Sequence, residues 1–373
     1  MEPSRIRRVF AIPTAPVVLV FIVSRFVILF LVIITYALHI PPPIDPYHGE
    51  PGLINPFTAF DSEHYIAIAT SGYTHLYQFA FFPLYSLLMA TLHHITGLSV
   101  AWAGVIISNV SVLITLALLV KLLPNPARNP GLWLFALNPI AMFETAVYTE
   151  ALFVALCLST WYSYKKQHYV LSGILLALAI NTRNLGAILV VPILVDWWAH
   201  RHEPGALRMF WQGGIPVILL GLLYPFYQLI TQGNAFLFIT VESQFWNRHL
   251  TFPLYTLWLD CVRFIHVNYA YKVEIVINFI SIGFVTYLCK IFWKTQKPLV
   301  LFLLVTTIIP LLDAMGLTFE PASVSLFRYI YASFPIYLLA PLDSESKWFR
   351  NFRLIVLSLM MIITIFFVSK WLF

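Results

Sequence analysis

The densest group of side chains able to do chemistry lies within residues 60–73. Asp61 and Glu63 place two carboxylates within one helical turn, and His64 and Tyr65 follow directly. If this segment is helical, Asp61, His64 and Tyr65 share one face. A carboxylate that faces water can take a proton from a substrate hydroxyl, so Asp61 is a candidate general base, with Glu63 and His64 as its helpers. The alternative is structural, because an Asp at this position is also a good helix N-cap.

Two further polar groups interrupt apolar runs. Tyr148 and Glu150 stand at the turn of an apolar hairpin, and an ionisable group so close to a bilayer is a functional candidate. Arg183 and Asn184 separate two short apolar runs, and a guanidinium beside helix ends suits a phosphate. Structural alternatives stay open: Glu150 could cap the next helix, and Arg183 could pair with Glu144 or Glu150.

Residues 242–253 mix aromatic, amide and basic side chains, among them Trp246, Asn247 and Arg248. Stacking rings together with amide and guanidinium donors suit a sugar or a lipid headgroup. The alternative is an interfacial aromatic belt with a basic anchor.

The composition indicates the class of protein that must position these groups. The chain has 373 residues, of which 60% are hydrophobic and 10% are charged, whereas soluble domains carry about a quarter charged residues. We therefore expect one all-helical, polytopic membrane domain over residues 1–373. The net charge of +6 comes from Lys and Arg between apolar runs, which is typical of cytoplasmic flanks and argues against a nucleic-acid partner. The three cysteines are scattered without metal-ligand spacing, so no metal site is predicted.

Hydropathy and the distribution of basic residues predict the topology. Arg5, Arg7 and Arg8 precede the first apolar run, which places the N-terminus in the cytoplasm. We expect outer loops at 39–98 and 232–272, with residues 80–96 forming a helix that lies on the outer surface, and about ten crossings in all. The apolar runs behind this expectation are 17–36, 100–122, 132–147, 151–164, 169–180, 185–198, 215–230, 273–289, 299–312, 329–339 and 354–369.

Several motifs occur in an order that resembles a known family. They are Phe60-Asp61-Ser62-Glu63-His64-Tyr65, Gly72-Tyr73, Ala80-Phe81-Phe82-Pro83, Asn138-Pro139, Tyr148-Thr149-Glu150, Arg183-Asn184, Phe245-Trp246-Asn247 and Arg328-Tyr329. This series is similar to the PIG-V family, the second mannosyltransferase of glycosylphosphatidylinositol assembly. The chain departs from that pattern at Phe60, where Trp is usual, at Leu185-Gly186, where Gly follows directly, and at Arg248-His249, where Val-Gly is usual.

The resemblance implies an inverting membrane glycosyltransferase of the GT-C type. It would move mannose from dolichyl- or polyprenyl-phosphate mannose to a lipid-linked glycan, as an α-1,6-linked second mannose if the enzyme is of the eukaryotic kind. The reaction would take place on the lumenal face of the endoplasmic reticulum in a eukaryote, or on the outer face of the plasma membrane in a prokaryote. No cofactor beyond the donor lipid is expected, and a small membrane-protein subunit is a candidate partner.

The resemblance also assigns roles to residues. Catalysis falls to Asp61, Glu63 and His64; the donor to Arg183, Asn184, Tyr148 and Glu150; and the acceptor or other contacts to Tyr65, Trp246, Asn247, Arg248 and Arg328. The alternative from another functional class is a transporter or flippase for a lipid-linked or anionic substrate. Such a protein should show inverted repeats with broken helices in both halves.

Overall fold

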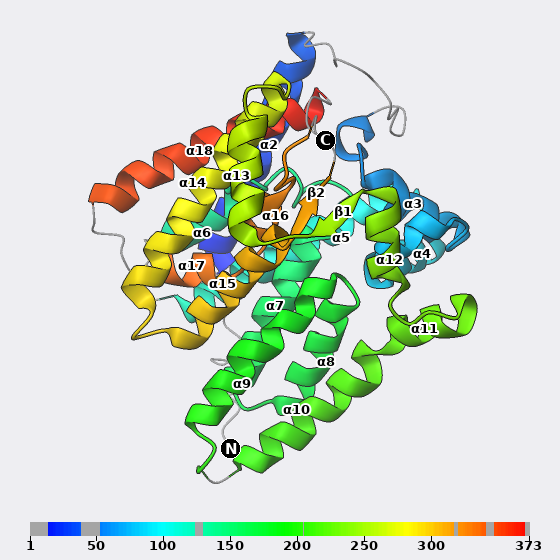
Figure 1. The fold of residues 1–373 in the computed structure, drawn as a ribbon, viewed down its shortest axis with the longest axis vertical. Helices are drawn as coiled ribbons and strands as arrows, with labels where there is room; N and C mark the ends of the chain where they lie inside the picture. Colours follow the sequence, from blue (N-terminus) through cyan, green and yellow to red (C-terminus); the bar gives the residue numbers. More distant parts are fainter. Residues whose placement is uncertain are drawn as a thin grey trace.

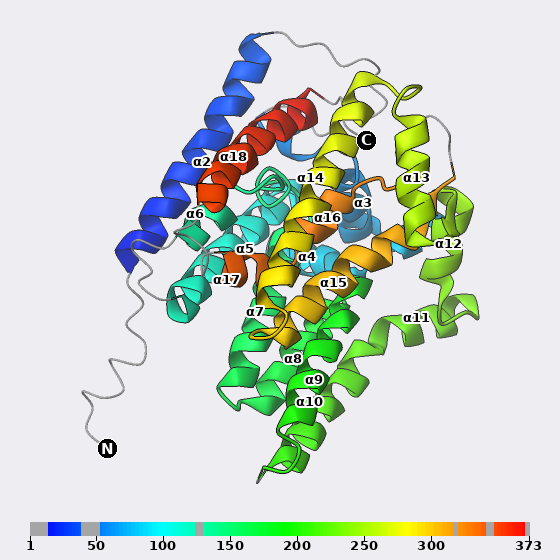
Figure 2. The ribbon, with the colours of Figure 1, turned by 60° about the vertical axis from the view of Figure 1, so that its left-hand side comes forward.

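The computed structural model describes residues 14–38, 53–123, 130–203, 205–316, 320–340 and 347–369. Most of these residues are helical, and the helices pack into the bundle drawn in Figures 1 and 2. The predicted class, a helical membrane protein, is confirmed.

Among the described residues, four helical stretches are long and apolar enough to cross a membrane. They are α2 (Thr14–Ala37), α5 (Val100–Leu122), α10 with α11 (Ala206–Gly221 and Leu223–Gln232) and α14 (Tyr269–Phe292). The shorter apolar helices are α8 (Tyr169–Ile180), η4 with α9 (Asn184–Leu189 and Val190–Ala199), α15 (Lys297–Leu311) and the second part of α18 (Lys347–Val368). The total of about ten membrane crossings stays a prediction.

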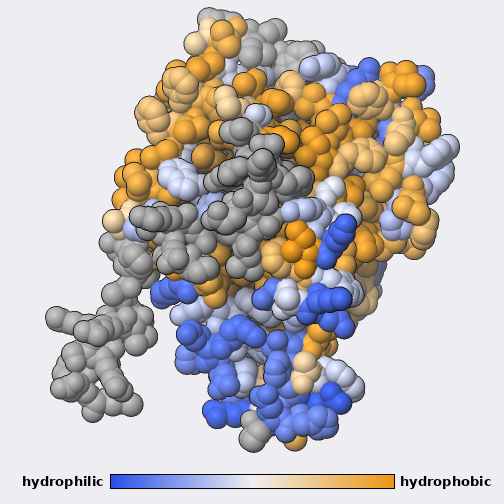
Figure 3. Space-filling view, turned by 90° about the vertical axis from the view of Figure 1, so that its left-hand side faces the viewer, coloured by the Kyte–Doolittle hydropathy of each residue, from blue (hydrophilic) through white to orange (hydrophobic). Residues whose placement is uncertain are grey.

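The surface of these helices suits a lipid environment. Phe26 on α2 and Ile218 on α10 are 68% and 61% exposed, as expected of side chains that face hydrocarbon. On the face shown in Figure 3, apolar side chains cover most of the upper surface, and hydrophilic ones gather at the lower end.

Two of the predicted spans are not single helices, so these two predictions are wrong. A proline accounts for the interruption in each. The run 132–147 forms only α6 (Pro130–Ala136) and then continues as turns up to α7 (Glu150–Lys165). The helix ends at Ala136, shortly before Asn138, because Pro139 disfavours helical geometry in the residue that precedes it. Asn138 stabilises the turn that follows, because its Oδ1 accepts a hydrogen bond from the amide of Ile140 at 2.6 Å. The run 329–339 is likewise divided, into α16 (Leu326–Tyr331) and α17 (Pro335–Leu339).

Most of the predicted helix at 80–96 is present, because residues 83–96 are helical. The short η2 (Leu76–Ala80) leads into α4 (Pro83–Thr96), which starts with a proline at its first turn and ends at Gly97. One side of α4 is buried and the other exposed, and Figure 1 shows it beside α3 (Ser62–Ser71), with α12 (Leu237–Phe245) also on this side of the molecule. That α4 lies on the outer membrane surface stays a prediction.

A small sheet departs from the expected all-helical architecture. Strand β1 (Arg248–Leu250) pairs antiparallel with β2 (Asp313–Met315), with Arg248 opposite Met315. The sheet joins the segment of α12 and α13 (Pro253–Arg263) to the end of α15. Three-residue strands leave too short an alternation pattern to be seen in a sequence. Their pairing brings two segments that are about 60 residues apart to one place.

Candidate active site

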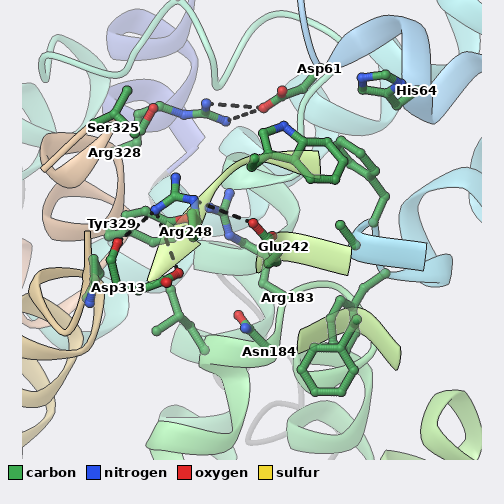
Figure 4. Close-up of a pocket in the computed structure, with 18 of the residues that line it drawn as sticks. Asp61, His64, Arg183, Asn184, Glu242, Arg248, Asp313, Ser325, Arg328 and Tyr329 are labelled. Carbon is green, nitrogen blue, oxygen red and sulfur yellow. Dashed lines mark hydrogen bonds and ion pairs between the residues drawn. The ribbon is translucent and has the colours of Figure 1, made fainter. Parts of the chain in front are cut away.

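A cavity of about 330 Å³ opens where α3, η4, α12, β1, α14 and the segment after α15 meet. Figure 4 shows its labelled side chains converging from these elements. The sequence-predicted residues in its wall are Asp61, His64, Tyr65, Tyr148, Arg183, Asn184, Trp246, Arg248 and Arg328. Residues from both halves of the chain therefore build one site.

A chain of alternating charges forms one wall of the cavity. Asp61 Oδ2 accepts hydrogen bonds from Arg328 Nη1 at 3.2 Å and Nη2 at 3.3 Å. Arg328 also donates to Glu150 Oε1, from Nη2 at 2.6 Å and from Nε at 2.9 Å. Arg183 reaches the same oxygen of Glu150 at 2.9 Å. Glu150 is fully buried beneath the wall and joins the two guanidinium groups.

The contacts of Asp61 and Arg183 decide between the alternatives considered for them, which were a helix cap for Asp61 and an ion pair for Arg183. Asp61 makes no side-chain cap hydrogen bond to α3, so its carboxylate serves Arg328 and the cavity instead. Arg183 does pair with Glu150, one of the two partners considered for it. Its Nη1 also donates to Thr149 Oγ1 at 3.1 Å. Arg183 is therefore both a partner of Glu150 and part of the cavity wall.

Backbone geometry and aromatic rings hold the Asp61–Arg328 pair in place. Phe60 has a φ of 58°, an uncommon conformation for a bulky residue, directly before Asp61. The guanidinium carbon of Arg328 lies 4.7 Å from the ring centroid of Phe143 and 4.9 Å from that of Tyr148. Cation–π contacts on two rings fix the direction of the guanidinium. Figure 4 shows it pointing at Asp61.

An aromatic group adjoins Asp61 on the other side. His64 lies one turn along α3, with its ring centroid 4.6 Å from Phe81 and 6.4 Å from Trp246. Burial lowers the pKa of His64 below its usual value, although the carboxylates of Asp61 and Glu63 oppose this shift. The imidazole is therefore mostly neutral at pH 7. Rings beside a carboxylate are typical of sites that bind sugars.

A second charged group lies around Arg248. Its Nε is 3.4 Å from Glu242 Oε2, and its Nη1 is 3.7 Å from Asp313 Oδ2 and 3.2 Å from the Asp313 carbonyl oxygen. Partial burial raises the pKa of Glu242 to about 6, helped by the nearby carboxylates of Asp313 and Asp61 and opposed by the arginines. Burial also raises the pKa of Asp313, which Arg248 opposes.

A tight backbone approach positions Arg183 and Asn184. The chain leaves α8, passes through an extended Arg183, and folds back at once as η4. A Cβ built on Gly186 would lie 2.6 Å from the carbonyl carbon of Ala179, closer than real Cβ atoms approach. Only glycine therefore allows η4 to return so close to the end of α8. As a result, Asn184 lies in the cavity wall beside Arg183, as Figure 4 shows.

Besides Glu150, which lies beneath the wall, two predicted site residues lie outside it. Glu63 is half-buried on α3 and does not line the cavity. Asn247 has a φ of 49° at the turn into β1, and its carbonyl oxygen accepts a hydrogen bond from the amide of Gly316 at 2.8 Å. Asn247 therefore shapes the turn that carries Arg248, and a substrate role for either residue stays a prediction.

Several wall residues were not predicted from the sequence, namely Glu242, Tyr271, Asp313, Glu320, Ser325 and Tyr329. Glu242 carried a signal, because it begins the aromatic and basic segment of Trp246. Asp313 carried a weaker one, as an acid directly after a long apolar run. Within the described ranges, no group of three or more His, Cys, Asp or Glu side chains is arranged to hold a metal ion.

Buried side chains of α13 and α14 hold the irregular segment that precedes Arg328. Asp260 accepts hydrogen bonds from the amide of Ala322 at 2.6 Å and from the amide and hydroxyl of Ser323. Glu274 Oε1 accepts from the amide of Ser325, which lies in the cavity wall, at 2.5 Å. Asn278 donates to the Ser323 carbonyl oxygen at 2.8 Å and accepts from the amide of Phe327 at 3.0 Å. Side chains here satisfy backbone groups that a helix or sheet would otherwise pair.

Comparison with known proteins gives this site a context. Residues 15–195 match the sequence profile of a family described as Mannosyltransferase (PIG-V). The PIG-V resemblance is confirmed. The match includes Asp61, Glu150 and Arg183, whereas Trp246, Arg248 and Arg328 lie beyond it.

Curated relatives agree with the PIG-V match. The chain is 36% identical over 152 residues to GPI alpha-1,6-mannosyltransferase 2 of Mus musculus, which is 37% of this chain and 31% of that protein. It is 34% identical over 154 residues to the Cricetulus griseus protein of the same name and 32% identical over 154 residues to that of Homo sapiens, with the same shares covered. The matched stretch thus spans about a third of the length of these relatives.

A solved structure shows the same fold over most of the chain. ArnT from Cupriavidus metallidurans, crystallised with undecaprenyl phosphate, superposes with a TM-score of 0.52 at 13% identity. The superposition covers 90% of this chain and 62% of ArnT. At this identity the likeness concerns the fold, and it includes the C-terminal half that the PIG-V match leaves out.

Proposed function

We propose that this protein is an inverting mannosyltransferase. In this proposal it transfers mannose from dolichyl- or polyprenyl-phosphate mannose to a lipid-linked glycan at the cavity between Asp61 and the arginines. The observation that carries the proposal is the geometry of this cavity. An exposed edge of a carboxylate, 34% accessible, shares one wall with three arginine side chains. A base and guanidinium groups that can bind a leaving phosphate are the two features that this reaction needs.

The chemistry assigns a separate task to each side of the cavity. An acceptor hydroxyl attacks the anomeric carbon of mannose and forms a new C–O bond, while the bond from that carbon to the phosphate oxygen breaks. Asp61 takes the proton of the hydroxyl, and the phosphate leaves with the bonding electron pair. The arginines stabilise the negative charge that the phosphate gains. Direct displacement inverts the anomeric centre without a covalent sugar–enzyme intermediate.

The donor phosphate belongs in the arginine-lined part of the cavity, whose wall includes Arg183, Asn184 and Arg248. A guanidinium binds phosphate oxygens with two parallel N–H donors, which an ammonium cannot do. The aromatic group of His64, Phe81 and Trp246 lies beside Asp61, so the acceptor sugar would lie against these rings. In this arrangement, the transferred mannose occupies the space between the two sides.

The finer assignments rest on the PIG-V relatives. The named activity of those relatives supports an α-1,6 linkage and a second mannose if this chain is of the eukaryotic kind. The endoplasmic reticulum, or the plasma membrane in a prokaryote, would be its location, with the site on the lumenal or outer face. A small membrane-protein subunit is a further proposed partner.

The test is direct transfer by the purified protein. It would be incubated with radiolabelled polyprenyl-phosphate mannose and a panel of lipid-linked glycan acceptors in detergent, and products separated by chromatography. We expect label in an acceptor lipid, with α-linked mannose released by α-mannosidase. Transfer to no acceptor, together with movement of labelled lipid across reconstituted vesicles, would favour the transporter or flippase alternative instead.

A further inference from the structure

The arginines of the cavity differ in how firmly their present partners hold them. Arg183 and Arg328 both bind Glu150, at 2.9 and 2.6 Å, and that carboxylate is fully buried. Arg248 contacts its carboxylates at the longer distances of 3.4 and 3.7 Å. Short contacts to a buried partner are costly to break, because the partner would be left as an uncompensated charge. Arg248 can exchange its partners far more easily.

The two carboxylates that contact Arg248 are more exposed to water than Arg248 itself. The side chains of Glu242 and Asp313 are 38% and 44% exposed, whereas the side chain of Arg248 is only 12% exposed. Ion pairs with such exposed carboxylates are weak. Figure 4 shows the carboxylates of Glu242 and Asp313 directed at the guanidinium of Arg248.

The overall charge of the cavity makes such an exchange necessary for an anion. The wall holds three arginines against four carboxylates, those of Asp61, Glu242, Asp313 and Glu320, and Glu150 lies beneath. A phosphate that enters without any change would join a site with excess negative charge, which Coulomb repulsion disfavours. At least one carboxylate must therefore swing away or take up a proton.

We propose that Arg248 is the arginine that binds the donor phosphate, and that Glu242 and Asp313 occupy its guanidinium only while the site is empty. This assignment rests on the proposed function. It adds which arginine contacts the phosphate and which two carboxylates the phosphate replaces there. When the lipid phosphate arrives, its oxygens replace the two carboxylates at Arg248. Arg183 and Arg328 keep their bonds to Glu150 and contribute positive potential.

The exchange makes donor binding depend on pH. The groups that face Glu242 are Arg248 on β1, Asp313 on β2, Asp61 before α3 and Arg183 before η4. Tyr329 and His249 complete the charged and titratable surroundings of Arg248 and Asp313. Because the pKa of Glu242 is about 6, this side chain is ionised at pH 7.5 and competes for Arg248, but it is largely neutral at pH 5.5. Donor binding should therefore strengthen as the pH falls through 6.

The experiment measures the dissociation constant of decaprenyl-phosphate mannose in detergent at pH 7.5 and 5.5. The donor is a phosphodiester, so its own charge does not titrate in this range. Glu242→Gln removes the competing charge, and we expect it to bind the donor about threefold to tenfold more tightly than the wild type at pH 7.5. The advantage should vanish at pH 5.5, and Arg248→Gln should bind at least tenfold more weakly at both pH values.

Asp196→Asn is the matched control. Asp196 lies on α9 beside Lys165, away from the cavity, and its replacement changes the net charge of the protein by the same amount. Its affinity should equal that of the wild type. Wild-type protein that binds the donor while Glu242→Gln binds no more tightly would overturn the exchange at Arg248. Wild-type protein that binds neither this donor nor decaprenyl phosphate would instead contradict the proposed function.

Discussion

Arg183 and Arg328 share one buried carboxylate, and this sharing determines what each side chain can do. Glu150 has no exposure to water, so its charge depends on both guanidinium groups. Removing a partner from a buried ion pair typically costs about 3–5 kcal/mol. Any substitution at these positions therefore changes stability as well as chemistry, and a variant that keeps the charge is the more informative one.

Arg183→Lys keeps the charge but loses the planar set of donors. A lysine ammonium is a point charge that cannot match both Glu150 and Thr149 as Arg183 does at 2.9 and 3.1 Å. We expect the KM for the donor to rise and kcat to fall, each by roughly tenfold. Kinetics with labelled donor would measure both.

Arg201→Lys is the control for the Arg183 variant. Arg201 is exposed after α9 and stacks on Trp198, outside the cavity. Its kinetics should match the wild type. A donor KM and kcat for Arg183→Lys within twofold of the wild type would show that Arg183 serves only the structure.

Helix α14 presents the face that shapes the part of the cavity wall formed by C-terminal residues. Tyr271, Glu274 and Asn278 recur at helical spacing, so they lie on one face. Tyr271 reaches the cavity wall, while Glu274 and Asn278 hold the backbone at Ser325 and Phe327. Ser325 has a φ of 62°, a conformation that needs support from its surroundings. The segment therefore owes its shape, and Arg328 its position, to this helix.

Glu274→Leu should disturb activity through Arg328. The change leaves the Ser325 amide buried without an acceptor, which costs about 1–3 kcal/mol. We expect kcat/KM to fall about tenfold or more, and Glu274→Gln, which keeps an acceptor oxygen, to recover most of it. In a double-mutant cycle with Arg328→Lys, the two losses should be clearly less than additive.

Ser281→Ala is the control on the same helix. Ser281 is equally buried, and its hydroxyl donates to the carbonyl oxygen of Ile277 in its own helix. Additive losses in the cycle would mean that Glu274 stabilises the fold without positioning Arg328. Comparison of melting temperatures in detergent would separate lost stability from lost activity.

The helices that could be predicted are those defined by hydropathy alone. The runs 100–122 and 169–180 coincide with α5 and α8. The errors at 132–147 and 329–339 come from Pro139 and Pro335, whose local effect overrides a continuous apolar pattern. The strands β1 and β2 carry no pattern long enough to detect, and their pairing depends on contacts between distant segments.

At the scale of the whole molecule, the site could be predicted only in part. Asp61, Glu150 and Arg183 stand out in the sequence because charge is rare in an apolar chain. Glu242 and Asp313 join the site only because the sheet brings Arg248 to the end of α15. Such a meeting of segments is a property of the tertiary fold, which no local pattern records.

The fold also brings the two halves of the chain together at one cavity. The PIG-V match ends at residue 195, yet Arg328 in the C-terminal half holds Asp61 and Glu150 in the first half. The general-base assignment depends on this contact, since Arg328 sets the direction of the carboxylate. The proposed role of Asp61 is therefore the central claim to test.

The most direct measurement is the transfer rate of Asp61→Asn with labelled polyprenyl-phosphate mannose and the acceptor that the wild type uses. Asparagine keeps the shape of the side chain but cannot take a proton, so turnover should fall by roughly 10²–10⁴. Donor affinity should stay largely unchanged, because Asp61 lies on the acceptor side of the cavity. An Asp61→Asn protein that transfers mannose near the wild-type rate would contradict the account, and loss of transfer in Glu63→Gln would then move the general base to Glu63.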